Sequence, residues 1–91
     1  MKAYDNVWDA IEDSPEAAAS MEARATIMMT VQKVVRGWRL SQQAAAAKLG
    51  ISQPRLNDLL RGKIDKFSLD ALFDLASLAG LKVSVRLRKA A

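Results

Sequence analysis

The sequence contains no cysteine and no histidine among its 91 residues. Without cysteine the chain can form neither a disulfide framework nor a thiolate zinc site. Without histidine it lacks the side chain that most often serves as a general acid–base or a metal ligand. The acidic residues near the N-terminus do not follow the spacing of a glycine-bearing calcium loop. We therefore expect a protein that is not an enzyme and that holds no metal and no cofactor.

Long apolar runs are also missing. No segment approaches the roughly 20 apolar residues that a membrane span needs. The acidic N-terminus does not resemble a secretory signal, so we expect a cytoplasmic protein. Half of the 91 residues are hydrophobic, which is enough for one small domain with a core. A chain this short is only marginally stable alone, and dimerisation is a common remedy.

Charge is divided unevenly along the chain. Residues 1–22 hold one lysine against six acidic residues, a net charge of −5. Residues 23–91 hold thirteen lysines and arginines against four aspartates, a net charge of +9. A basic body suggests a polyanionic partner such as nucleic acid, and an acidic start suggests a separate cationic partner.

The sequence predicts a long helix from Ser14 to about Arg36. Ser14 is suited to the N-cap and Pro15 to the first turn, and Gly37 follows the last turn. Its apolar face is wide, as expected for a helix that packs on several neighbours. The residues expected on or beside that face are Met21, Ala25, Ile27, Met28, Val31, Gln32, Val34 and Val35.

Two short helices with a glycine turn between them follow. Ser41 is suited to cap the first, which ends at Gly50, and Ser52 the second, which ends at Gly62. In the second helix three leucines fall at i, i+3 and i+4 and must face inward. This pattern predicts a helix-turn-helix, whose second helix enters the major groove of DNA. The leucines are Leu56, Leu59 and Leu60.

A fourth helix is expected from Ser68 to Gly80, buried on one side. The residues expected on that side are Leu69, Leu72, Phe73, Ala76 and either Leu78 or Ala79.

The period then changes to strict alternation, which predicts a half-buried strand in the tail. Its apolar positions are Leu81, Val83, Val85 and Leu87. No second strand is evident, so we expect the same strand of a second copy to pair across a twofold axis. Edge pairing with a different protein is the competing possibility.

The outward side chains of the second short helix are those that DNA reading requires. Gln53 and Asn57 can form two hydrogen bonds with an adenine edge, and Arg55 with a guanine edge. Candidate phosphate contacts surround them, and these are Gln42, Ser52, Arg61 and Lys63. Asp58 is unexpected here because its negative charge would repel phosphate. Three alternatives are open: it stays at the rim of the groove, it accepts a hydrogen bond from cytosine, or it pairs with Arg55 or Arg61. The competing interpretation is a solvated polar face.

The run from Ser41 to Lys63 resembles the XRE (Cro/C1-type) helix-turn-helix family, and more narrowly the HigA-like antitoxins. The features shared with that subgroup are Asn6-Val7-Trp8, Gln53-Pro54, Arg61-Gly62-Lys63, Phe67-Ser68 and the basic alternating tail. The resemblance covers nearly the whole chain. It implies a mainly α, lambda-repressor-like helical bundle with a C-terminal β-strand paired across a dimer. Its parts would be an acidic arm (1–13), a helix-turn-helix domain (14–80) and a strand with a basic tail (81–91).

The same resemblance implies a homodimer that binds a palindromic operator in double-stranded DNA. Such proteins repress their own operon and neutralise a RelE-like toxin. In that scheme Gln42 braces Gln53 and touches phosphate, while Gln53, Arg55 and Asn57 read bases. Asn57 stands where many relatives have serine, and Pro54 replaces a polar base-contacting residue, so the base preference is not implied. The alternatives are a stand-alone XRE-type regulator and a protein-binding adaptor.

The acidic start gains a candidate role from this resemblance. RelE-like toxins are basic, so Asp9, Glu12 and Asp13 could cover the toxin's cationic surface. The simpler interpretation is that these carboxylates favour helix starts and solubility.

Overall fold

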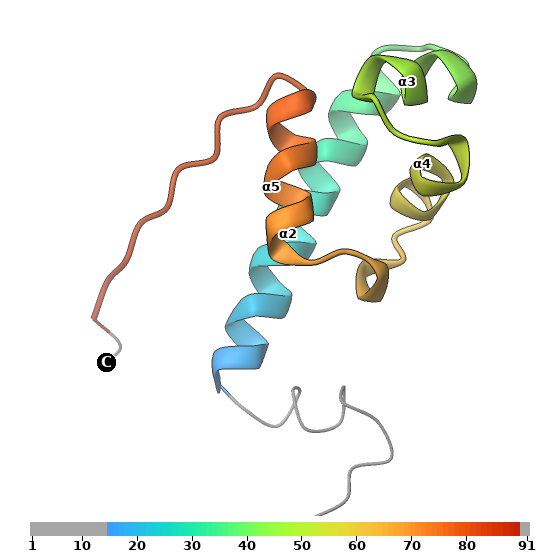
Figure 1. Ribbon diagram of the computed structural model, residues 1–91. Coiled ribbons are helices and arrows are strands. Elements are labelled where there is room, and N and C mark those ends of the chain that lie inside the picture. The colour runs from blue at the N-terminus through green and yellow to red at the C-terminus, as the bar shows by residue number, and fades with distance from the viewer. Residues whose placement is uncertain (1–14, 90–91) are drawn as a thin grey trace, which may run out of the picture.

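The computed structural model describes residues 15–89 (Figure 1). Four α-helices and one short 3-10 helix follow one another in this range. They are α2 (Pro15–Gly37), α3 (Gln42–Leu49), α4 (Gln53–Leu60), η1 (Ile64–Lys66) and α5 (Leu69–Leu78).

Serine caps begin three of these helices, as the sequence predicts. Each serine is extended, and its hydroxyl oxygen accepts a hydrogen bond from the backbone N–H three residues later. The distances are 3.1 Å for Ser41, 3.2 Å for Ser52 and 3.1 Å for Ser68. The predicted cap at Ser14 lies outside the described residues.

The core lies between α2 and α5, which run side by side, and the α3–α4 pair, of which α4 contacts α2 (Figure 1). Each helix turns one apolar stripe into it, with residues three and four apart as helical periodicity requires. The largest fully buried side chains are Phe67, Leu49, Leu56, Leu59, Leu72 and Val31. From α2 the buried apolar residues are Met28, Val31 and Val35, so the predicted inward face of this helix is confirmed there.

The buried face of α5 differs in part from the expected one. Leu75, which the sequence analysis did not select, is 4% exposed, whereas Leu78 is 54% exposed. At about 100° per residue, Leu75, Ala76 and Ala79 lie close to Leu72 around the helix, and Leu78 falls well outside that stripe. Of the two alternatives for the last position, Ala79 packs against the core and Leu78 does not.

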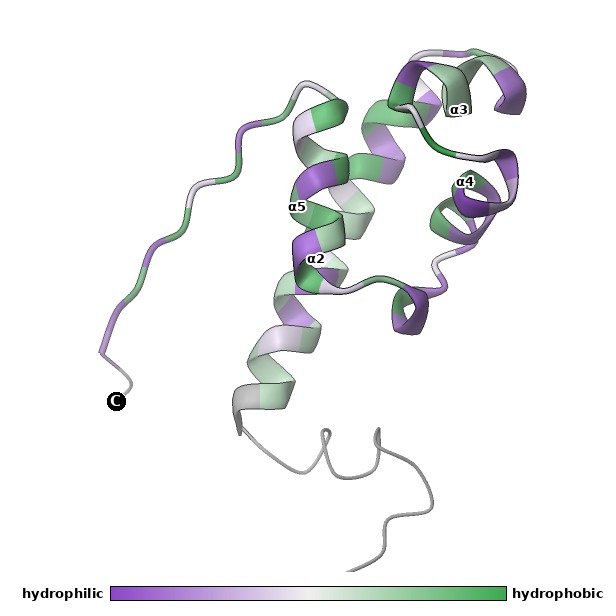
Figure 2. Cartoon of the chain, viewed as in Figure 1, coloured by the Kyte–Doolittle hydropathy of each residue, from purple (hydrophilic) through white to green (hydrophobic). Residues whose placement is uncertain are grey.

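The tail leaves the end of α5 as an extended segment, residues 81–89, which has no strand partner in the described chain. Leu81 donates its N–H to Ala76 O at 2.8 Å, and no other backbone hydrogen bond recorded for the described part of the chain involves this segment. Figure 2 shows its alternation of hydrophobic and hydrophilic residues. Strand pairing across a dimer therefore stays a prediction.

The acidic arm (1–13), with Asp9, Glu12 and Asp13, lies outside the described residues. Within the described range, no helix is both long enough and apolar enough to cross a membrane.

Candidate nucleic-acid interface

A tight left-handed turn joins α3 to α4. Gly50 has φ +72°, a conformation that costs a residue with a Cβ about 1–2 kcal/mol. Its N–H donates to Ala47 O at 3.1 Å, and the N–H of Ile51 reaches back to Ala46 O at 3.0 Å. These bonds satisfy carbonyls that the end of α3 would otherwise leave open. The turn therefore fixes the orientation of α4 relative to α3. Ile51, which follows Gly50, packs against the core.

Helix α4 buries two of its three leucines, leaves Leu60 partly exposed, and turns its polar side outward. Leu56 and Leu59 are fully buried, so the helix cannot rotate without exposing them. Gln53 and Pro54 are exposed, and Asn57 is partly exposed one turn after Gln53. Arg61, just past the helix, is exposed as well. The predicted amide-bearing positions thus lie on the accessible side of this helix. Figure 2 shows that α4 carries both hydrophilic and hydrophobic residues.

Arg55 is held against the body of the protein. Its Nη1 donates to Lys66 O at 2.7 Å, and the guanidinium carbon lies 3.9 Å from the centre of the Phe67 ring. Phe67 is itself only 1% exposed, so the guanidinium of Arg55 packs on a ring that the core holds in place. The sequence analysis placed Arg55 among the outward residues and did not foresee these contacts.

Two polar side chains from α2 hold the C-terminal end of α4. Gln32 donates from Nε2 to Leu59 O at 2.8 Å, and Arg36 donates from Nη2 to Leu60 O at 2.9 Å. The last carbonyls of a helix have no partner inside it, so these bonds complete the end of α4. The sequence showed no sign of this, because the bonds join residues 24 and 27 positions apart.

Asp58 pairs with lysines rather than with either arginine that the sequence analysis considered. Its carboxylate lies 3.6 Å from Lys63 Nζ and 3.9 Å from Lys66 Nζ. The side chain of Asp58 is 20% exposed, against 39% and 52% for the two lysines. Lys63, a predicted phosphate contact, is therefore already paired with the carboxylate of Asp58 in this structure. No recorded ion pair in residues 15–89 involves Arg61.

The start of α3 provides the remaining predicted contact. Ser41 caps this helix, and Gln42 is exposed in its first turn, which is also where the helix has backbone N–H groups without a partner inside the helix. At the other end of α3, Lys48 Nζ lies 4.2 Å above the centre of the Trp38 ring. The amides on α4 are suited to contact base edges. The cations beyond the end of α4 and the N-terminus of α3 are suited to contact phosphates.

The fold and this surface define a helix-turn-helix protein. The model of a helix-turn-helix domain family matches residues 10–88. A solved structure described as an XRE-family transcriptional regulator is 33% identical and superposes with a TM-score of 0.72, covering 80% of this chain and 82% of its own. The search of curated proteins gives no match. The chain belongs to the helix-turn-helix domain family, within the XRE type.

Proposed function

We propose that this protein is a transcriptional repressor of the XRE type that binds an operator in double-stranded DNA. Family membership supports the coarser statement, that it is a DNA-binding regulator of transcription. The proposal of an operator-binding repressor rests on the orientation of α4. Its N-terminal turn exposes Gln53, while burial of Leu56 and Leu59 prevents the helix from rotating about its axis. A reading helix needs that combination of a fixed axis and accessible amides.

Gln53 and Asn57 are the proposed base-reading residues on this helix. Arg55 can reach a guanine only after giving up its contacts with Lys66 O and Phe67. Arg61, Gln42 and Ser52 are the proposed phosphate contacts, and Lys63 joins them by exchanging Asp58 for a phosphate oxygen.

We further propose that two copies bind an inverted repeat. Half-site centres would lie about one helical turn, or ~34 Å, apart, because two symmetric reading helices must reach the same side of the duplex. The twofold would run through the tail, with Leu81, Val83, Val85 and Leu87 paired between copies.

The experiment is a comparison of two alanine variants on operator and random DNA over a range of salt. Gln53→Ala should cost about 1–3 kcal/mol on the operator and little on random DNA. Arg61→Ala should weaken both and reduce the salt slope by about 1. Equal effects of both substitutions on both DNAs would leave only non-specific binding and would overturn sequence reading by α4.

The finer biological role that we propose is that of an antitoxin paired with a RelE-like toxin. It rests on the HigA-like features of the sequence and on the charge of the acidic arm. Co-expression with the small open reading frame beside the gene tests it. Rescue of growth from a toxic neighbour supports the antitoxin role, and a harmless neighbour favours a stand-alone regulator in the cytoplasm.

The acidic arm has its own test. Replacing Asp9, Glu12 and Asp13 by Asn or Gln should slow association with the toxin, because steering by opposite charge acts on the association rate. Operator binding should not change. An unchanged association rate would contradict this role for the arm.

A further inference from the structure

The carboxylate of Asp58 lies between two lysines at the corner where α4 leads into η1. Its Oδ1 is 3.6 Å from Lys63 Nζ, and its Oδ2 is 3.9 Å from Lys66 Nζ. A charge-assisted hydrogen bond is shorter, at about 2.8 Å, so these contacts are attractions between separated charges. We call the three side chains the Asp58 cluster. Because the carboxylate offsets one lysine, the cluster carries a single net positive charge.

Hydrogen bonds of the backbone hold both lysines beside Asp58. The N–H of Lys63 donates to Asp58 O at 3.1 Å, and the N–H of Lys66 donates to Lys63 O at 3.0 Å. Lys66 O accepts in turn from Arg55 Nη1 at 2.7 Å. The two lysine side chains therefore begin close to the carboxylate, so the Asp58 cluster is set by the fold of this corner.

Asp58 is placed on the part of α4 that would approach DNA. It follows the exposed Pro54 by one helical turn and is the neighbour of Asn57. Its side chain is 20% exposed, so an incoming phosphate can come close to the carboxylate. A negative charge here repels phosphate and also attracts the two cations that would otherwise bind one. Affinity for DNA alone gives no reason for a carboxylate at this position.

Random DNA and an operator differ in what a free cation can contribute. Binding to random DNA depends almost entirely on phosphate contacts, and no base contact keeps the protein in one register there. The protein can therefore shift until each free cation meets a phosphate. On an operator, base contacts by α4 would fix the register, so a cation contributes only where that register brings it to a phosphate. A carboxylate that neutralises a lysine thus weakens random binding more than operator binding.

We propose that Asp58 is a specificity-determining residue, which holds Lys63 and Lys66 and so weakens binding to random DNA. Weakening the wrong complex raises specificity just as strengthening the right one does. Ion pairs between partly exposed charges are weak, and the two lysines are 39% and 52% exposed. A phosphate can therefore displace the carboxylate, so Asp58 lowers the affinity without blocking DNA. This role rests on the proposed function, and it adds Lys66 to the cations that can meet a phosphate.

Titration of the full chain with a duplex of scrambled sequence, over a range of salt, tests this role. Asp58→Asn keeps the size of the side chain and removes its charge. At roughly 0.1 M salt the affinity should rise about five- to tenfold, and the salt slope should steepen by about 1, as for one added phosphate contact. An unchanged affinity would overturn the role given to Asp58.

Asp65→Asn is the matched control for net charge. Asp65 is exposed in η1, in the same corner, and within the described chain no recorded ion pair involves it. Its replacement should change the affinity less than about twofold, because water and salt screen an unpaired exposed charge. A control that gains as much as Asp58→Asn would overturn the proposal, since total charge alone would then explain the gain.

The promoter fragment upstream of the gene shows whether specificity changes. Asp58→Asn should strengthen binding to this fragment less than binding to scrambled DNA, so the ratio of the two affinities falls. Asp58→Ala should do the same, which excludes a new base contact by the asparagine. Equal gains on both DNAs would contradict the proposal. A loss on the promoter fragment alone would contradict it too, and would make Asp58 a base-reading residue.

Lys66→Met gives a second, independent measurement. It removes one positive charge from the Asp58 cluster, so the salt slope on scrambled DNA should become shallower by about 1. An unchanged slope would contradict a phosphate contact by Lys66. Gln53→Ala separates these results from the proposed function. It should lower the affinity ratio through the promoter fragment, whereas Asp58→Asn lowers it through scrambled DNA.

Discussion

At the scale of the residue, two polar side chains of α4 are bound by other residues of the protein itself. Arg55 lies on Phe67 and donates to Lys66 O, and Asp58 faces Lys63 and Lys66. Sequence reasoning recognised both as polar residues of the right type but could not assign their partners. The choice between pairing with a neighbour and pointing to solvent depends on where the chain returns after Gly62, which local periodicity does not determine.

Replacing Arg55 by methionine tests whether the guanidinium stabilises the fold. The loss of the bond to Lys66 O and of the contact with Phe67 should lower the free energy of unfolding by about 1–2 kcal/mol. Urea denaturation measures this. Arg61→Met is the matched control, and it should change stability little because Arg61 is exposed. An unchanged midpoint for Arg55→Met would show that its guanidinium is not held by the body.

At the scale of the element, the helix starts were predictable, whereas the side chains that hold the end of α4 were not. Serine caps and glycine stops act over three or four residues, so the sequence places Ser41, Ser52 and Ser68 correctly. Leucine spacing likewise identifies the buried face of α4. The bonds from Gln32 and Arg36 depend on how α2 crosses α4, which is a property of the assembled fold.

The contribution of Gln32 can be measured directly. Gln32→Met keeps the length of the side chain and removes its bond to Leu59 O. We expect a loss of about 0.5–1 kcal/mol, towards the low end for a hydrogen bond, because Leu59 O still accepts from Gly62 N at 3.1 Å. Lys33→Met, at the exposed neighbouring position, serves as control in the same urea titration. A loss no larger than that of the control would contradict the role given to Gln32.

Two glycines that both have open space around them should respond in opposite directions to alanine. Gly50 has φ +72°, so Gly50→Ala should destabilise by about 1–2 kcal/mol through backbone strain alone. Gly37 ends α2 without a positive φ, so Gly37→Ala should stabilise by about 0.4–1 kcal/mol. Thermal unfolding of the two variants measures both effects. A Gly50→Ala variant as stable as the wild type would contradict a fixed left-handed turn.

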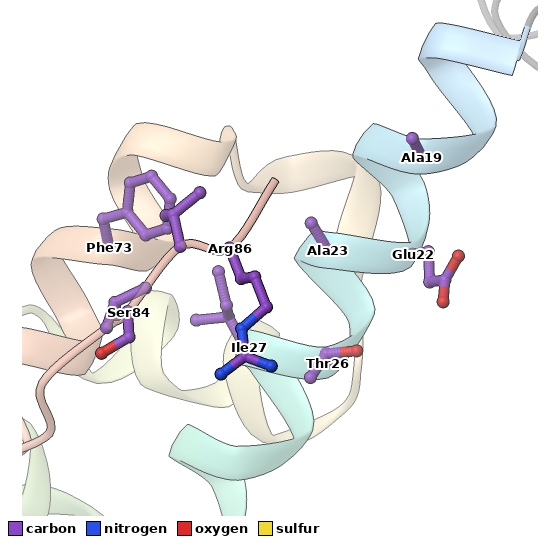
Figure 3. Close-up of a pocket in the computed structure, with 10 residues that line it drawn as sticks. Ala19, Glu22, Ala23, Thr26, Ile27, Phe73, Ser84 and Arg86 are labelled. Atoms are coloured by element: carbon purple, nitrogen blue, oxygen red, sulfur yellow. The ribbon is translucent and has the colours of Figure 1, made fainter. Parts of the chain in front are cut away.

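At the scale of the whole molecule, α4 and the tail lie on different sides of the α2–α5 pair (Figure 1). In the proposed function, this separation would let α4 face DNA while the tail pairs with a second copy. The sequence indicated both surfaces, one by its capped helices and one by its alternating tail. The groove between α2, Phe73 of α5 and the tail (Figure 3) could not be foreseen, because it is formed by α2, α5 and the tail together.

The central claim is that α4 lies in the major groove, and tethered DNA cleavage tests it most directly. A single cysteine at Pro54, an exposed position beside Gln53, can carry an iron chelate that cleaves nearby sugars. The claim predicts two clusters of cleavage on operator DNA, one in each half-site, with centres about one helical turn apart. The same chelate at Leu78, exposed on α5, should cleave far less. Uniform cleavage from position 54, or stronger cleavage from position 78, would contradict the claim.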